Sequence, residues 1–325
     1  MTTSGNVSFN LNTNQIVRTS LRKIGAISAG ETPDNQTVQD CTDQLNMLVK
    51  ALAATGLHVW TETEATLFLQ PDQIAYTLGG TTTDHATESY TATTTTAAAL
   101  SGATTITVED TDGFGAGYQV GVVVDDGTIS WSLQSGAASG STITLATPLT
   151  DAAPSGATVF VYETGIVRPL RVVSGRRYAF SGTPTTGIST QMIPFSRIDY
   201  RNQPNKESPG TITQYFYDPR GGANTQGIMY VWPAPPDVTN AMKFTWWRPI
   251  QDFSTSADTP DLPQEWLDCL IWNLAYKMAP EYDTPPQRYN MLKEQAAGSL
   301  DLVMGWDREP ESYLFGVNTD QSARA

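Results

Sequence analysis

One stretch near the C-terminus, residues 261–280, constrains the fold of this chain more than any other. It reads DLPQEWLDCLIWNLAYKMAP, and its aliphatic residues recur at helical spacing: Leu267, Leu270, Ile271, Leu274 and Met278. The large rings of Trp266, Trp272 and Tyr276 flank that stripe. A helix with so few polar sides belongs in the centre of a core or against another subunit. The candidate oligomer-interface residues are therefore Trp266, Leu270, Trp272 and Tyr276.

The ends of this helix and of a second one are also readable. Asp261 is the predicted N-cap of the first helix, Pro263 suits its first turn and Pro280 ends it. Thr284 is the predicted cap of the next helix, whose apolar residues follow at three- and four-residue steps: Tyr289, Leu292, Ala296, Leu300 and Val303. We expect the two helices to fold back on each other.

Two further helices are predicted at the N-terminal end. The first covers residues 12–24, with Gly25 as its stop. The second has Thr32 as its cap and Pro33 at its first position, ends at Gly56 and carries the stripe Val38, Cys41, Leu45, Leu48 and Leu52. Together the four helices predict an antiparallel bundle built from both chain ends.

Between the helices the pattern changes to short strands separated by Gly, Pro and Asp turns. The expected strands are residues 66–69, 74–78, 104–108, 119–124, 128–133, 141–145, 158–162, 211–217, 227–232 and 241–247. The predicted class is α+β, with a helix bundle packed on a β meander. The predicted core is 1–80 with 166–308, the inserted all-β domain, a sandwich or barrel, is 85–165, and the C-terminal arm is 309–325.

Charge is low in amount and uneven in distribution. Charged residues make up 16% of the 325 residues and the net charge is −14, which argues against a general nucleic-acid binder. Residues 81–165 hold nine acids and no Lys or Arg, whereas residues 166–220 hold eight bases and three acids. The contrast indicates two modules with different neighbours.

Little catalytic equipment is visible in the sequence. The two histidines, His58 and His85, lie far apart, and residues 110–113 and 113–117 are better explained as turns than as a calcium or phosphate loop. Glu62 and Glu64 share one face of a strand, but nothing places a substrate groove there. Cys41 and Cys269 lie in apolar helical contexts and are expected to be buried thiols. We expect no catalytic residue, metal or cofactor.

The basic segment offers candidate contact residues. Arg176 and Arg177 follow a glycine, and Arg201 and Lys206 flank a proline, so both pairs are expected in loops. They can contact DNA phosphates in a channel or form intersubunit ion pairs. Aromatic interleaving suited to base stacking is not evident, which argues against single-strand binding.

Several stretches, in order, resemble the head-to-tail adaptor family of short-tailed double-stranded-DNA phages, also called tail accessory or packaged-DNA stabilisation factors. They are LRKIGA at 21–26, AGETP at 29–33, LNML at 45–48, SRIDY at 196–200, YVWP at 230–233, LPQEW at 262–266 and APEY at 279–282. The likeness covers roughly 10–80 and 166–310. The insertion departs from the smaller family members, which leaves its role open.

The resemblance implies a structural virion protein rather than an enzyme. Such adaptors form a dodecameric ring under the portal protein, extend the DNA channel, which double-stranded DNA crosses without specific binding, and carry the tail nozzle and fibres. The implied location is the phage neck, after assembly in the host cytoplasm. No run of about 18 uncharged apolar residues is present, so no membrane association is expected.

Two alternatives from other classes stay open. A virion-associated cell-wall hydrolase with a carbohydrate-binding insertion would need a cleft with paired carboxylates, one of raised pKa. A free-standing adhesin would carry a secretion signal, which residues 1–15 do not resemble. The C-terminal arm contains the apolar triplet Tyr313, Leu314 and Phe315, which we expect either to dock on the portal or to fold back on the last helix.

Overall fold

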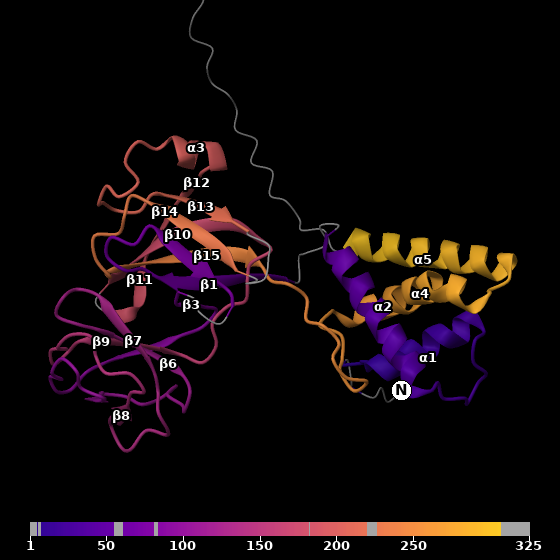
Figure 1. The fold of residues 1–325 in the computed structure, drawn as a ribbon, viewed down its shortest axis with the longest axis horizontal. Coiled ribbons are helices and arrows are strands. Elements are labelled where there is room, and N and C mark those ends of the chain that lie inside the picture. Colours follow the sequence, from indigo (N-terminus) through magenta and orange to yellow (C-terminus); the bar gives the residue numbers. More distant parts are fainter. Residues whose placement is uncertain are drawn as a thin grey trace, which may run out of the picture. The chain divides into compact units, whose positions relative to one another are not determined.

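The computed structural model divides into two compact units (Figure 1). The helical unit combines Met1–Trp60 with Ile250–Ala325, and the strand unit is Thr61–Pro249. The structure describes residues 5, 8–54, 61–80, 84–181, 183–219 and 226–306. The fold is mixed α+β with several largely antiparallel sheets, as the sequence predicted at that level. The antiparallel bundle itself stays a prediction.

The helical unit has one hydrophobic core shared by helices from both ends of the chain. Its helices are α1 (Thr13–Ile24), α2 (Asn35–Ala54), α4 (Leu267–Met278) and α5 (Pro286–Trp306). Helix α4 packs against each of the other three, with α5 beside it (Figure 1). Trp266, Leu270 and Leu274 are fully buried in this core. The apolar stretch at residues 261–280 is therefore the centre around which the unit is built.

Both ends of α1 lie within one residue of the predicted range 12–24. The Asn12 side chain accepts the Gln15 backbone N–H while the Gln15 side chain accepts the Asn12 N–H, which satisfies two donors that the helix itself leaves open. Gly25 ends the helix at φ +90°, in the left-handed region. The Arg288 guanidinium of α5 donates to the Ile24 carbonyl at 2.9 Å and thereby caps this end a second time.

Replacing Gly25 tests that end. A Cβ at this position would both force an L-residue to φ +90° and collide with Nη1 of Arg288. We expect Gly25→Ala to lower the free energy of unfolding by about 2 kcal/mol, measured by urea denaturation. Gly30 has φ +92° but open space at its Cβ, so Gly30→Ala should lower it by only about 1 kcal/mol. Equal losses in the two variants would show that the Arg288 contact contributes nothing.

Two predicted caps were assigned to the wrong residues. Helix α2 is capped by Asp34, whose carboxylate accepts the Thr37 N–H at 2.8 Å, rather than by Thr32. Asp261 does not cap α4, because a 3₁₀ turn, Gln264–Trp266, precedes that helix. Its carboxylate instead accepts the Gln251 N–H at 3.1 Å. In both cases several nearby side chains carry an oxygen that could accept a backbone N–H. The path of the backbone in the folded unit decides which of these oxygens lies close to which N–H.

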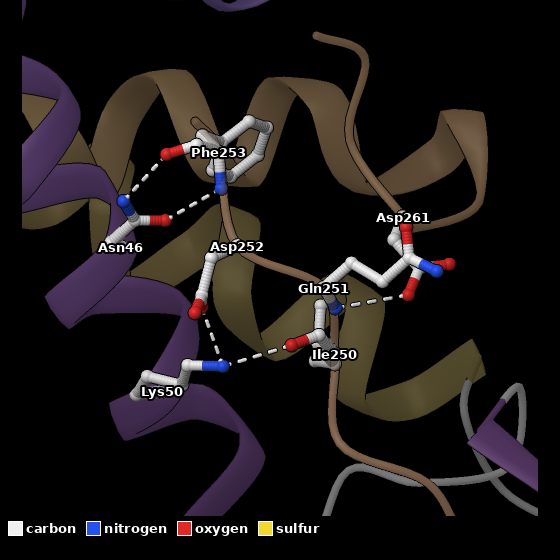
Figure 2. A network of polar contacts seen from close by, with 7 residues as sticks. All are labelled: Asn46, Lys50, Ile250, Gln251, Asp252, Phe253 and Asp261. Carbon is white, nitrogen blue, oxygen red and sulfur yellow. Dashed lines mark hydrogen bonds and ion pairs between the residues drawn. The ribbon is translucent and has the colours of Figure 1, made fainter. Parts of the chain in front are cut away.

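The segment that opens the C-terminal half of the helical unit is fastened to α2 (Figure 2). Asn46 exchanges two hydrogen bonds with the Phe253 backbone, at 3.0 and 2.9 Å, and the Phe253 ring is buried in the core. Lys50 donates to the Ile250 carbonyl at 2.9 Å and pairs with Asp252 at 2.6 Å. These contacts satisfy backbone groups of a segment without regular structure and fix it on the helix.

The strand unit contains two sheets packed face to face. The first has the order β11-β10-β15-β1-β3 and the second β12-β13-β14-β2. Their bounds are β1 Glu62–Phe68, β2 Ala75–Leu78, β3 Ala86–Thr87, β10 Arg171–Ser181, β11 Thr183–Gln191, β12 Ile193–Pro194, β13 Gln214–Asp218, β14 Gly227–Trp232 and β15 Asn240–Trp247. Buried side chains of both sheets, including Phe244, Trp246, Tyr76 and Val231, form one cluster between them.

The acidic middle of the chain forms a third, four-stranded sheet, β4-β9-β6-β7, with a separate β5-β8 ribbon. The strands are β4 Thr91–Thr94, β5 Thr105–Thr107, β6 Gln119–Val123, β7 Ile129–Leu133, β8 Thr142–Thr144 and β9 Thr158–Tyr162. This region has a core of its own, and a second cluster joins Phe160 and Tyr162 to Phe68 of β1. The five strands expected between residues 104 and 162 are thus present, whereas an independent domain at 85–165 stays a prediction.

The expected loop at Arg176 and Arg177 is wrong. Both residues lie in β10, which forms a hairpin with β11 and pairs with β15. Gly175, the residue that suggested a turn, is needed inside the strand because a Cβ there would press against Tyr215 and Met242. Arg201 is not in a loop either, since it belongs to α3 (Arg197–Asn202), whereas Lys206 follows that helix.

Candidate interaction surfaces

A groove of about 350 Å³ opens in the strand unit where β10 begins. Its walls come from β10, β13 and the segment after β12, and include Val172, Phe195, Arg197, Tyr215 and Phe216. Arg197 pairs with Asp218 at 2.7 Å, and Asp218 is 8% exposed. Because the guanidinium already faces a carboxylate, the groove suits an apolar side chain of a protein partner better than a phosphate.

The four predicted channel or intersubunit residues do not form one site. Arg176 pairs with Glu64 of β1, whereas Arg177, the next residue of β10, points to the other face and donates to Thr190 at 3.4 Å. Arg201 and Lys206 do lie together, because the Lys206 ammonium donates to the Arg201 carbonyl at 3.2 Å and closes the end of α3. A role of these four in contacting DNA or a neighbouring subunit stays a prediction.

An aromatic stack over the second sheet was missed from the sequence. Tyr200 of α3, Phe216 of β13 and Tyr230 of β14 lie with ring centroids 4.7–5.8 Å apart. Arg197 and Lys206 lie over two of these rings. The signal for the pair was the strand register, which places Phe216 opposite Tyr230. Because the rings stack on each other, their faces are occupied within the protein, and we still expect no base stacking here.

The carboxylate pair that a hydrolase would need has other partners. Glu64 lies beside Arg176 and within 4.0 Å of Lys243, and Glu62 accepts the indole N–H of Trp247 at 3.3 Å. These residues line one face of the first sheet, in register on β1, β10 and β15. The arrangement is an ion-pair ladder across three strands, which stabilises a sheet face.

The predicted oligomer-interface residues fall into two groups. Trp266 and Leu270 are 0% exposed and lie inside the core of their own unit. Trp272 and Tyr276 are half-buried at its edge, where Lys23 lies 3.3 Å from the centroid of the Trp272 ring and Tyr289 hydrogen-bonds Tyr276. The apolar surface that suggested a subunit contact is thus largely used within the chain, and an interface role stays a prediction.

The last candidate residues are the apolar triplet of the predicted arm, the two histidines and the two cysteines. Tyr313, Leu314 and Phe315 of the predicted arm, like His58, lie outside the described residues. His85 stacks on Trp131 at 3.9 Å between centroids, and burial lowers its pKa to about 4. Cys41 and Cys269 are free, buried thiols whose pKa burial raises to about 11. The described residues contain no group of three or more His, Cys, Asp or Glu that could hold a metal ion.

In the described part of the chain, none of the helices combines the length and the apolar character needed to cross a membrane.

The sequence model of a family described as SU10 adaptor protein matches residues 128–314, more than half of the chain. The match begins directly before β7 and runs through β13, β14, β15 and α4 to beyond α5. It therefore joins residues of both compact units in one family. No curated protein matches the chain.

Proposed function

We propose that this chain is the head-to-tail adaptor of a short-tailed phage. The premise is that it belongs to the SU10 adaptor protein family of structural phage proteins. Membership implies association with other head–tail proteins in the neck of the virion. The finer proposal is a dodecameric ring that docks under the portal, extends the DNA channel and carries the tail nozzle and fibres. The observation that carries it is the family match across residues 128–314.

Features of the helical unit support an assembly role. Leu302 of α5 is 77% exposed, and Met47 of α2 and Met291 of α5 are 51% and 45% exposed. Large apolar side chains that stay exposed on ordered helices are the usual material of contacts between proteins. A ring subunit needs two different contact faces, which makes the helical unit the place where we expect them.

The charge of the chain is compatible with a DNA conduit. Its net charge of −14 repels the phosphate backbone, and several of its basic residues, Arg176 and Arg197 among them, are paired with acids. A wall of unpaired bases would retain DNA, whereas an acidic wall with scattered bases lets it slide. We propose that the acidic module at 85–165 faces away from the channel, since it contains no Lys or Arg.

Electron microscopy of the purified protein, alone and mixed with portal protein, tests this function. Rings that stack on the portal in coaxial particles are the expected result. A variant that ends at Arg308 tests the proposed docking arm in the same experiment, and we expect its portal affinity to fall at least tenfold because every subunit of the ring loses an anchor. A full-length protein that neither forms rings nor binds portal would overturn the proposal, and unchanged binding by the truncated protein would remove only the arm.

A further inference from the structure

Helices α1 and α2 of the helical unit carry opposite charges on their outer sides. Helix α1 has three basic residues, Arg18, Arg22 and Lys23, and no acidic one. Helix α2 has Asp40 and Asp43 and no basic residue before Lys50. Charge of one sign on each of two helices in the same compact unit is unusual for a solvent-facing surface, where both signs normally mix.

The basic face of α1 is made by Arg18 and Arg22, which lie one turn apart. Arg22 is exposed, and Arg18 is half-buried, with its buried Nε lacking a hydrogen-bond partner among the described residues. Neither makes an ion pair with any residue that the structure describes. Two further basic side chains already have partners. Lys23 of α1 lies over the Trp272 ring close to Asp268, and Arg288 of α5 donates to the carbonyl at the end of α1.

The acidic face of α2 is made by Asp40 and Asp43. Both are exposed and accept side-chain amide hydrogen bonds from Gln36 and Gln39 of the same helix, and the charge of Asp40 also acts on Cys41 and Tyr282. Met47, 51% exposed, continues the same side of α2 one turn further. The face therefore combines two carboxylates without an ion-pair partner in the described chain and an exposed apolar side chain.

Beside this face of α2, one more acidic residue and one basic residue contact Gln44. Glu281 accepts a hydrogen bond from Gln44 at 3.3 Å, and Lys277 donates to the Gln44 carbonyl at 3.2 Å. Tyr282, 36% exposed, follows Glu281. Lys277 balances Glu281, so the charge without a local partner is that of Asp40 and Asp43.

We propose that the Arg18/Arg22 face of one copy of this chain docks on the Asp40/Asp43/Met47 face of a second copy. Each face is the electrostatic complement of the other, and the two belong to different helices, so the contact is heterologous and repeats head to tail. DNA is a poorer partner for Arg18 and Arg22, because a chain of net charge −14 repels phosphates. This inference rests on the proposed function, for which it names the two faces that build the ring.

Two charge reversals test the contact. Arg18→Glu with Arg22→Glu makes both faces acidic, and Asp40→Lys with Asp43→Lys makes both basic, so each variant should self-associate at least tenfold more weakly than the native protein. An equal mixture of the two variants should assemble again, since each supplies the face that the other lacks. A chain with all four changes should also assemble. Sedimentation velocity and mass photometry in 50 and 300 mM salt measure this, with circular dichroism to verify folding.

The controls exclude effects of net charge and of stability. The two reversals change net charge in opposite directions, so no net-charge effect can weaken assembly in both. Asp112→Lys with Asp125→Lys places the same charge change as the second reversal on exposed turn positions of the strand unit, outside both faces, and should leave assembly unchanged.

Each other outcome overturns the inference. If both reversal variants assemble like the native protein, the subunits meet elsewhere, and the proposed function stands. If the Arg18/Arg22 reversal lowers affinity for a DNA duplex and leaves assembly unchanged, α1 is a nucleic-acid face. If the native protein forms no oligomer even in 50 mM salt, the contact does not exist, and portal binding in the same samples decides separately whether the protein is an adaptor.

Discussion

Replacing Trp266 by alanine is expected to lower the free energy of unfolding of the helical unit by about 3–5 kcal/mol, the usual cost of emptying a fully buried Trp site. Trp266 is 0% exposed and precedes α4, the helix that contacts the three others. Urea denaturation followed by far-ultraviolet circular dichroism measures the loss.

Trp272→Ala is the matched control, because it removes the same side chain from α4 itself, at the edge of the same core. Trp272 is half-buried and its ring is covered by Lys23. We therefore expect the free energy of unfolding to fall by only about 1–2 kcal/mol, because less apolar area and one cation–π contact are removed. If Trp272→Ala instead destabilises the isolated subunit as much as Trp266→Ala, the two positions are energetically equivalent and the division into core and edge is wrong.

The helices were predictable because their signals are local. Asn12 and Gln15 form the N-terminal cap of α1 within four residues of one another, and Gly25 alone supplies the left-handed stop. The apolar stripes of α2 and α4 are likewise written at three- and four-residue spacing. The same reasoning located the strands of the acidic module, whose turns carry glycine at positive φ, such as Gly127 and Gly156.

The predictions that were wrong concern residues whose contacts are with residues distant in sequence. Gly175 looks like a turn residue until Tyr215 and Met242 are seen to fill the space beside it. The partner of Arg176 is Glu64, more than one hundred residues away, so no local pattern could show that the charge is paired. The use of Asp261 by Gln251 has the same origin, because it depends on how the chain enters the helical unit.

The candidate surfaces were even less accessible to sequence reasoning. Exposure decides whether an apolar residue is core or contact, and Leu270 and Leu302 both occur in helical patterns although one is 0% and the other 77% exposed. The opposite charges of α1 and α2 were in the sequence from the start. That Arg18, Arg22, Asp40 and Asp43 form no ion pair with any described residue depends on the tertiary structure, which the sequence does not show.

Acidification from pH 6.5 to 4.5 is expected to lower the free energy of unfolding of the strand unit by about 2–3 kcal/mol through His85. The imidazole is stacked on Trp131, its Nδ1 lies 2.7 Å from the Tyr162 hydroxyl, and burial lowers its pKa from 6.5 to about 4. Because the histidine pKa is lower in the folded chain, the unfolded chain binds a proton between pH 6.5 and about 4 that the folded chain does not bind. Stability is therefore fully present above pH 6.5, falls as the pH drops below it, and levels off near pH 4.

The titration window separates His85 from the acidic groups. Asp34 and Asp258 belong to the helical unit, and hydrogen bonds from Thr37 and Thr255 hold their pKa below its ordinary value, so their contributions are lost only at lower pH. His85→Asn keeps a polar atom near the position of Nδ1, close to Tyr162, but does not titrate, and its urea midpoint should stay nearly constant between pH 6.5 and 4.5. His58→Asn, which changes the only other histidine, should retain the native slope. A native slope in His85→Asn would mean that the ring is already protonated, or already exposed, in the folded aromatic cluster.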